Sequence, residues 1–156
     1  MKNIIFLTIL AYSSLFSKEI NLDNMIKKAQ NHNKQIMIFI HIPDCPYCES
    51  MKNENFQDKK TLEEIKKNFL LEDINVKDFI LFKGEKKTHK EFAKSIGIFV
   101  FPSTLFMGGT GEVLFRSMGY RNIDEYLAEI KYISSKSYKK ISLEKFLENL
   151  EFEQDD

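Results

Sequence analysis

The chain has two cysteines, Cys45 and Cys48, which stand three positions apart in the stretch HIPDCPYCESM. A cysteine at the beginning of a helix meets unpaired backbone N–H groups and a partial positive charge, and both stabilise its thiolate. A second cysteine three residues later lies one turn deeper on the same face, where it can resolve a mixed disulfide formed by the first. The spacing therefore predicts thiol–disulfide exchange, in which Cys45 is exposed and attacks while Cys48 is shielded and releases.

Other uses of the cysteine pair explain its spacing less well. A disulfide across so short a loop constrains the unfolded chain little, so a purely structural bond is a poor explanation. A zinc site requires four ligands, and the histidines that remain, His32, His41 and His89, show no paired spacing. Glu49 follows the second cysteine, where haem attachment requires a histidine. We expect no metal and no cofactor other than the redox-active disulfide, with metal binding by the pair as an alternative.

The first seventeen residues have the layout of a secretory signal peptide. Lys2 provides a positive start, residues 4–11 are apolar, and small or polar residues lead to Ser17. The apolar part is shorter than the roughly 18 residues that span a bilayer. We therefore expect a signal peptide over residues 1–17, one domain over residues 18–156, export to the periplasm, and no stable membrane insertion after cleavage. A net charge of zero gives no reason to expect nucleic acid as a partner.

Two predicted elements lead into the cysteine pair. Apolar residues recur at helical spacing in residues 21–34, which predicts a helix with one buried face. An unbroken apolar run, residues 36–40, predicts a strand buried on both faces, as in a parallel sheet. Pro43 ends this strand, and Cys45 then begins a helix with Pro46 in its first turn. The first sulfur is thus predicted at a strand–helix junction.

The rest of the chain supplies further helices and strands. A capping box at Thr61 and Glu64 predicts one helix start. A second box at Thr88 and Glu91 predicts another helix, which ends at Gly97. The other predicted elements are a strand over 68–76, an irregular excursion over 77–87 that turns at Gly84, a hairpin over 103–118, a helix over 123–133 capped by Asn122, and a last helix over 143–150. This order predicts an α/β fold, a mixed sheet with helices on both faces.

Two motifs carry a resemblance to a known family. The segment DCPYC at a strand–helix junction, followed by AKSIGIFVFPSTLFM, resembles the thioredoxin superfamily. The segments CPYCESM and GYRNIDEYLAEIKYI, with the extra C-terminal helix, are more narrowly similar to exported SoxW-like thioredoxin-related proteins. The resemblance implies a thioredoxin-like fold, with Cys45 as nucleophile, Cys48 as resolving thiol and Pro102 as a cis proline facing them. It also implies that the backbone of Phe101 pairs with an extended substrate strand, and we expect Pro46 and Tyr47 to contact the substrate.

The sequence departs from the thioredoxin pattern at three places. Thioredoxins carry a buried acid six residues before the first cysteine, and this chain has Phe39 there, so Cys48 must be activated by another group or by solvent. The tryptophans that thioredoxins carry before the motif are absent, and His41 and Asp44 stand in that region; Asp44 is a candidate helix cap, and its charge would also disfavour the neighbouring thiolate. The dipeptide Pro46-Tyr47 is that of glutaredoxins, but the cis proline follows Val-Phe rather than Thr-Val, which argues against a glutathione site.

These observations predict an exported thiol–disulfide oxidoreductase that acts as a reductase of protein disulfides. The partners implied are protein thiol or disulfide clients and a membrane electron donor. Two alternatives stay open. One is an oxidase or isomerase that introduces or shuffles disulfides, and the other is a metal-binding chaperone of the same fold that uses the two cysteines as ligands.

Overall fold

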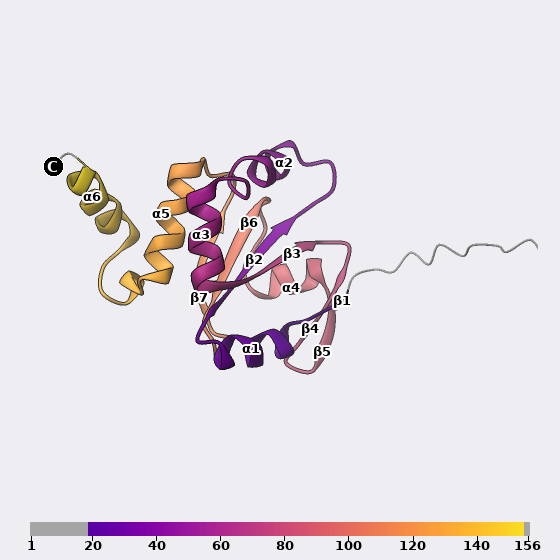
Figure 1. The fold of residues 1–156 in the computed structure, drawn as a ribbon. Helices are drawn as coiled ribbons and strands as arrows, with labels where there is room; N and C mark the ends of the chain where they lie inside the picture. The colour runs from indigo at the N-terminus through magenta and orange to yellow at the C-terminus, as the bar shows by residue number, and fades with distance from the viewer. Residues whose placement is uncertain (1–18, 155–156) are drawn as a thin grey trace, which may run out of the picture.

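The computed structural model describes residues 19–154; the predicted signal peptide, residues 1–17, lies outside the described residues. A four-stranded mixed sheet forms the centre of the molecule, with the strand order β3-β2-β6-β7 (Figure 1). Strands β2 and β3 are parallel, whereas β6 runs antiparallel to β2 and β7 antiparallel to β6. The bounds are β2 Gln35–His41, β3 Phe69–Asn75, β6 Ser103–Met107 and β7 Val113–Met118. The predicted mixed sheet is confirmed.

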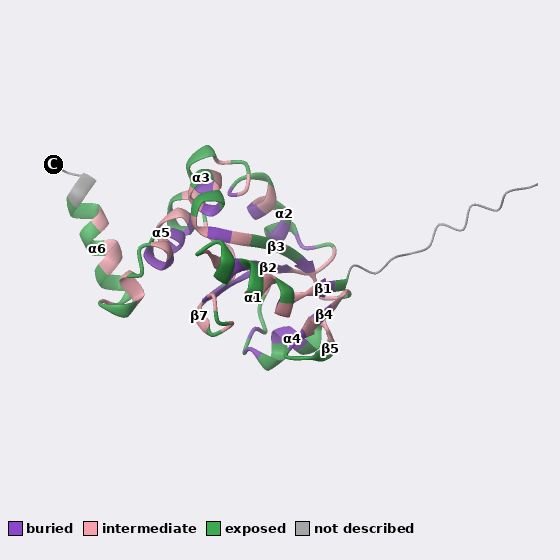
Figure 2. Ribbon diagram, turned by 60° about the horizontal axis from the view of Figure 1, so that its bottom comes forward, coloured by how far each residue is buried: buried purple, intermediate pink, exposed green. Residues whose placement is uncertain are grey.

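Strand β2 is buried on both faces, as its unbroken apolar run predicts. Its even-numbered residues pack in one cluster with α1 (Leu22–Asn31) and α4 (His89–Ser95). Its odd-numbered residues Met37 and Phe39 pack in a second cluster with α2 (Pro46–Asn53), α3 (Lys59–Asn68) and α5 (Ile123–Ser134). Figure 2 shows buried residues along the central strands and on the sides of the helices that face them. Because side chains alternate along a strand, β2 separates two layers of core.

A second sheet of three strands, in the order β1-β4-β5, replaces the predicted irregular excursion at residues 77–87. Its strands are β1 Glu19–Asn21, β4 Phe79–Phe82 and β5 Glu85–Thr88. The prediction of an irregular segment was wrong because the hairpin depends on distant partners. β1 pairs in parallel with β4, and the Asp23 carboxylate of α1 accepts the backbone N–H groups of Lys83 and Gly84 at 2.8 and 2.9 Å.

The helix starts follow local capping, with one correction. The capping box at Thr88 and Glu91 is confirmed, and Asn122 caps α5 as predicted. The box predicted at Thr61 and Glu64 is wrong, because α3 begins earlier and is capped by Asp58, whose carboxylate accepts the N–H of Thr61 at 2.8 Å. An aspartate is as good a cap as threonine, and it stands where it can add a turn to the helix.

The C-terminal part ends in the extra helix that the sequence predicts. A short 3-10 helix, η1 (Ser137–Lys139), leads to α6 (Leu143–Gln154), which packs on α5 at the edge of the molecule (Figure 1). Through residue 152, the side chains of α6 are all exposed or half-buried (Figure 2). None of the helices described between residues 19 and 154 has the length and apolar character to cross a membrane.

Candidate active site

The two cysteines lie at the start of α2, shortly after the central strand β2 ends. Cys45 is the N-cap residue of α2, with extended backbone angles, and Pro46 opens the helix in its first turn as predicted. The last residue pair between β2 and β6 joins Ile40 to Ser103. The segment after β2 and the segment before β6 therefore emerge at the same edge of the sheet. This edge brings the Cys45 loop and the Phe101-Pro102 loop to one end of the molecule.

Cys45 and Cys48 form a disulfide, with their Cα atoms 5.2 Å apart. The Sγ atom of Cys45 accepts the backbone N–H of Cys48 at 3.2 Å, so the first sulfur caps the helix. This N–H also donates to the carbonyl oxygen of Cys45 at 3.0 Å, and it would stabilise negative charge on the Cys45 sulfur after reduction. The helix start thus supplies the stabilising contact that the sequence predicts for Cys45.

The accessibility of the two cysteines differs in the predicted direction but by less than predicted. Cys48 is fully buried, and Cys45 is 8% exposed rather than open to solvent. Cys45 is covered because its sulfur turns toward the helix, where it bonds to Cys48 and accepts the helix N–H. Only Cys45 offers any surface to an incoming disulfide.

The loop before β6 has the predicted cis peptide bond between Phe101 and Pro102. Pro102 is buried, and the hydroxyl of Ser103 donates to the carbonyl oxygen of Val100 at 2.6 Å. Within residues 19–154, the backbone N–H and carbonyl of Phe101 form no hydrogen bond. An unpaired backbone at an edge is a place where an extended peptide can add.

Exposed apolar side chains are present on α2 and on the loop before the cis proline. Tyr47 of α2 is 66% exposed, and Phe99 and Val100 before the cis proline are 68% and 51% exposed. The ring of Tyr47 lies 5.8 Å from that of Tyr120, centroid to centroid. Large apolar side chains that stay exposed are candidate contacts for a partner. Sequence reasoning identified Tyr47 but missed Phe99 and Val100, although both stand directly before the Phe101-Pro102 motif.

Phe39 occupies the position of the missing acid and is 1% exposed. Its ring stacks on that of His41 at 5.9 Å and meets the ring of Phe56 edge-on at 5.0 Å. The parallel register pairs Phe39 with Asp73 of β3. A carboxylate therefore stands beside Phe39, on the neighbouring strand.

Asp73 joins two basic side chains in a compact cluster. Its Oδ1 lies 2.9 Å from Nε2 of His41, and its Oδ2 lies 3.0 Å from Nζ of Lys52. Burial raises the pKa of the Asp73 carboxyl, but the hydrogen bonds from His41 and Lys52 outweigh it, and the net pKa is lowered. Sequence reasoning missed this cluster.

The side of Phe39 that faces β6 holds a different polar pair. Thr104, paired with Phe39 in the antiparallel register, shares a hydrogen bond of 2.7 Å with the hydroxyl of Tyr126. Tyr126 is fully buried, and this burial raises the pKa of its hydroxyl strongly, so the group stays protonated.

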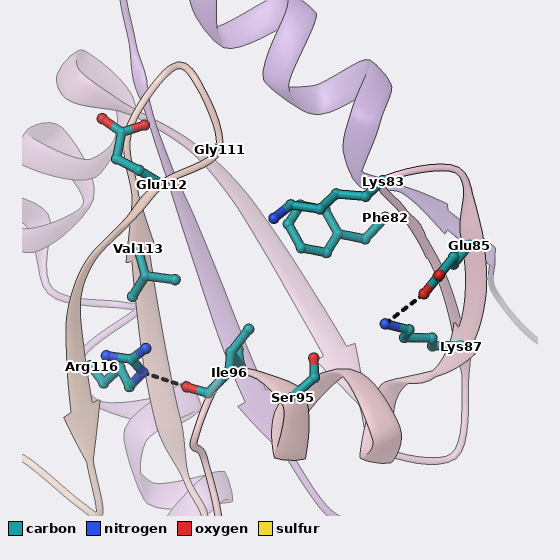
Figure 3. A pocket seen from close by; sticks show the side chains of 10 residues that line it. All are labelled: Phe82, Lys83, Glu85, Lys87, Ser95, Ile96, Gly111, Glu112, Val113 and Arg116. Atoms are coloured by element: carbon teal, nitrogen blue, oxygen red, sulfur yellow. Dashed lines mark hydrogen bonds and ion pairs between the residues drawn. The ribbon is translucent and has the colours of Figure 1, made fainter.

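A cavity of about 430 Å³ lies away from the cysteines, between the β4–β5 hairpin, the end of α4 and the β6–β7 hairpin (Figure 3). Glu85 and Lys87 form an ion pair of 2.9 Å at one side, and Arg116 donates to the carbonyl oxygen of Ile96 at the other. None of the predicted site residues lines this cavity. Among residues 19–154, no three His, Cys, Asp or Glu side chains gather closely enough to hold a metal ion.

The fold and the site together define a dithiol oxidoreductase, with a disulfide at a helix start and a cis-proline loop at the same edge of the sheet. The chain belongs to the thioredoxin-like domain family, whose sequence profile matches residues 22–134. With its CxxC disulfide, it is a thioredoxin-like protein-disulfide oxidoreductase. A comparison with curated protein sequences finds no significant match.

Solved structures of low sequence identity share the fold. A thioredoxin-fold protein from Helicobacter pylori is 20% identical over 76% of this chain and 80% of its own, with a TM-score of 0.61. A thioredoxin from Thermus thermophilus is 22% identical over 74% of this chain and 85% of its own, with a TM-score of 0.58. A DsbH oxidoreductase is 16% identical over 86% and 94%, with a TM-score of 0.59. These likenesses support the thioredoxin-like fold.

Proposed function

We propose that the protein is an exported reductase of protein disulfides, similar to SoxW-like thioredoxin-related proteins, in which Cys45 attacks and Cys48 resolves. The observation that carries the proposal is the position of the Cys45 sulfur. This sulfur caps α2, accepts the N–H of Cys48 at 3.2 Å, and belongs to the more accessible of the two cysteines. A thiolate there is stabilised by the helix start, and a thiolate is the species that attacks a disulfide.

The reaction proceeds through one mixed disulfide. The Cys45 thiolate attacks one sulfur of a client disulfide, so a bond from Cys45 to the client forms, the client S–S bond breaks, and the released client thiolate takes up a proton. Cys48 then loses its proton and attacks Cys45, which closes the Cys45–Cys48 disulfide and releases the second client thiol. Two electrons pass from the dithiol to the client. A membrane electron donor returns two electrons and two protons to the pair.

The client lies across the two loops at the edge of the sheet. The unpaired backbone of Phe101 offers a donor and an acceptor to an extended client segment, and we assign Pro46, between the cysteines, and Pro102, in the cis-proline loop, to the surface that contacts the client. Tyr47 supplies an exposed aromatic face beside them. Backbone pairing holds many sequences in the same way, which suits an enzyme that acts on more than one protein.

Trapping of the mixed disulfide tests the assigned roles. Cys48→Ser should accumulate covalent partners in the exported fraction, visible as larger species that disappear on reduction, because the mixed disulfide forms but is not resolved. Cys45→Ser is the matched control and should trap few partners, since the remaining thiol is fully buried. Equal trapping by the two variants, or more by Cys45→Ser, would show that the roles are wrong.

The direction of electron flow is tested by the reduction potential of the pair. The known range runs from about −270 mV for thioredoxin to about −120 mV for a strong oxidant. A reductase requires a value toward the low end, measured by equilibration with glutathione and separation of the two forms. A value near the oxidising end would instead favour the oxidase or isomerase alternative. Stoichiometric zinc or copper(I) held by the reduced protein against a chelator would favour the metal-binding alternative.

Export is tested at the N-terminus. We propose that residues 1–17 are removed and that the mature domain begins near Lys18. N-terminal sequencing of the protein from the periplasmic fraction should find this start. An intact Met1 in a soluble cytosolic fraction would exclude export by this route.

A further inference from the structure

The cavity shown in Figure 3 lies away from the cysteines and has an apolar floor. Phe82 of β4 and Ile96 at the end of α4, which are 9% and 7% exposed, form this floor with the half-buried Val113 of β7. Phe82 and Ile96 also belong to the core cluster that contains the even-numbered residues of β2, and the ring of Phe82 meets that of Phe92 edge-on at 5.6 Å. Because the core packs against these side chains, the floor is preformed.

Contacts between distant segments hold the two sides of the cavity in place. On one side, the Asp23 carboxylate accepts the backbone N–H groups of Lys83 and Gly84, which fixes the turn between β4 and β5. On the other side, Nε of Arg116 donates to the carbonyl oxygen of Ile96, so the guanidinium lies against the end of α4. Figure 3 shows the ammonium of Lys83 and the guanidinium of Arg116 on opposite sides of the cavity, with the side chain of Ile96 between them. Two cations therefore border the same space.

These two cations have no acid as a partner. The charged side chains that line the cavity are three bases and two acids: Lys83, Lys87, Arg116, Glu85 and Glu112. Lys87 is paired with Glu85 at 2.9 Å, and the Glu112 carboxylate accepts the backbone N–H of Thr110 at 3.2 Å and also its hydroxyl. Within residues 19–154, the ammonium of Lys83 and the two terminal nitrogens of Arg116 form no hydrogen bond and no ion pair. The cavity therefore presents two positive charges that a ligand can neutralise.

An apolar floor between two unpaired cations suits a small organic anion. The volume of about 430 Å³ falls within the range of about 300–1,000 Å³ that is typical of small-molecule sites. The terminal nitrogens of Arg116 can donate side by side to two oxygens of a carboxylate or sulfonate. The ammonium of Lys83, 5.2 Å from the centre of the Phe82 ring, adds a point charge above the floor. An inorganic anion would leave the floor uncovered, and a neutral apolar molecule would leave both cations unpaired.

We propose that this cavity binds a small organic anion, a carboxylate or sulfonate carried on an aromatic or branched apolar body. Arg116 and Lys83 bind the acidic group, and Phe82, Ile96 and Val113 contact the apolar body. None of these five residues belongs to the cysteine site. The inference therefore goes beyond the proposed function, and it does not depend on the roles of the two cysteines or on the direction of electron flow.

Two fluorescent probes that differ by one acidic group test this site. Anilinonaphthalene sulfonate carries an aromatic body and a sulfonate, and phenylnaphthylamine has the same rings without the acid. Titration of the oxidised full chain should show saturable binding of the sulfonate probe, with an affinity on the order of tenfold higher than that of the neutral probe. Raising the ionic strength from about 0.01 M to about 0.15 M shortens the Debye length from about 30 Å to about 8 Å. This change should weaken binding of the sulfonate probe and leave the neutral probe within about twofold.

Substitution of each cation tests where the acidic group binds. Lys83→Gln and Arg116→Gln should each weaken the sulfonate probe on the order of tenfold and leave the neutral probe within about twofold. Lys94→Gln is the matched control, because it removes the same charge from an exposed side chain of α4 that does not line the cavity, and it should bind both probes as the wild type does. The side chain of Arg116 also bonds to Ile96, so Lys83→Gln keeps the test valid if Arg116→Gln fails to fold.

Amide NMR of the wild type locates the bound probe. The shifts that the sulfonate probe causes should gather around Ile96 and Val113. Shifts that gather at Tyr47 and Phe99 would place the probe on other exposed apolar side chains and overturn the inference. The absence of saturable binding, equal affinities for the two probes, or equal weakening by Lys94→Gln would overturn it as well. The titration involves no redox step, so its failure would leave the result of mixed-disulfide trapping intact, and the two proposals can fail separately.

Discussion

Reduction of the Cys45–Cys48 bond should lower the free energy of unfolding by only about 2 kcal/mol, the loop-closure value for a ring of four residues, against about 3 kcal/mol for a ring of 15. The backbone already holds the ring closed. The N–H groups of Cys48 and Glu49 donate to the carbonyl oxygen of Cys45 at 3.0 and 3.1 Å. In the reduced protein the helix start stabilises the Cys45 thiolate by about 0.3–1 kcal/mol, which makes the net loss smaller still.

Denaturant unfolding of the oxidised and reduced protein measures this difference. The two forms should show transitions of equal slope whose midpoints differ by the amount expected, and the double variant Cys45→Ser with Cys48→Ser should follow the reduced form. A loss of about 4 kcal/mol or more, or loss of fixed tertiary structure on reduction, would place the bond among structural disulfides. In that case the argument that this pair exists for exchange rather than for stability would be refuted.

Three further predictions concern the residues around the site. Thr104→Val should cost about 1–3 kcal/mol, because it leaves the buried Tyr126 hydroxyl unpaired, while adding Tyr126→Phe should recover most of the loss; additive losses in urea unfolding would contradict this. Phe99→Ser together with Val100→Ser should leave stability within about 1 kcal/mol, since both side chains are exposed, but raise KM for protein clients more than for a small disulfide; an equal change for both substrates would argue against a client surface. Folding lowers the pKa of Asp73, so its contribution to stability is present above about pH 4 and is lost as the pH falls further. Between pH 7 and pH 3, Asp73→Asn should therefore lose less stability than the wild type, by under about 1 kcal/mol because the group is half-exposed. Equal losses of stability in the two proteins would contradict this sign.

Short-range patterns made much of the fold predictable. The helix capped by Cys45 is predictable from two prolines. Pro43 lacks the backbone N–H that a strand requires, and the fixed φ of Pro46 suits the first turn of a helix. The capping box at Thr88 and Glu91 fixes a helix start through contacts three residues apart. The predictions failed where two local signals competed. Asp58 and Thr61 are both capable caps, and the structure uses Asp58.

The β4–β5 hairpin shows a different limit. Its turn at Lys83 and Gly84 is held by Asp23, and its outer edge is completed by β1, both from the beginning of the described chain. No pattern within residues 77–87 contains these partners. From its own residues this segment is predicted to be irregular, because its pairing depends on β1 and on Asp23.

The sequence by itself determined the chemistry of this protein: two cysteines at exchange spacing, a proline that opens their helix, and a Phe101-Pro102 loop that completes the thioredoxin-like pattern. These features can be predicted from the sequence because each depends on residues that lie within one turn or one loop of each other. Only the tertiary structure decided which groups surround Phe39, at the position where thioredoxins carry a buried acid. The parallel register of β2 and β3 sets Asp73 beside Phe39, and α2 then lays Lys52 over both. Such neighbours are made by strand register and helix packing, which join residues far apart in the chain, so no local pattern could have revealed them.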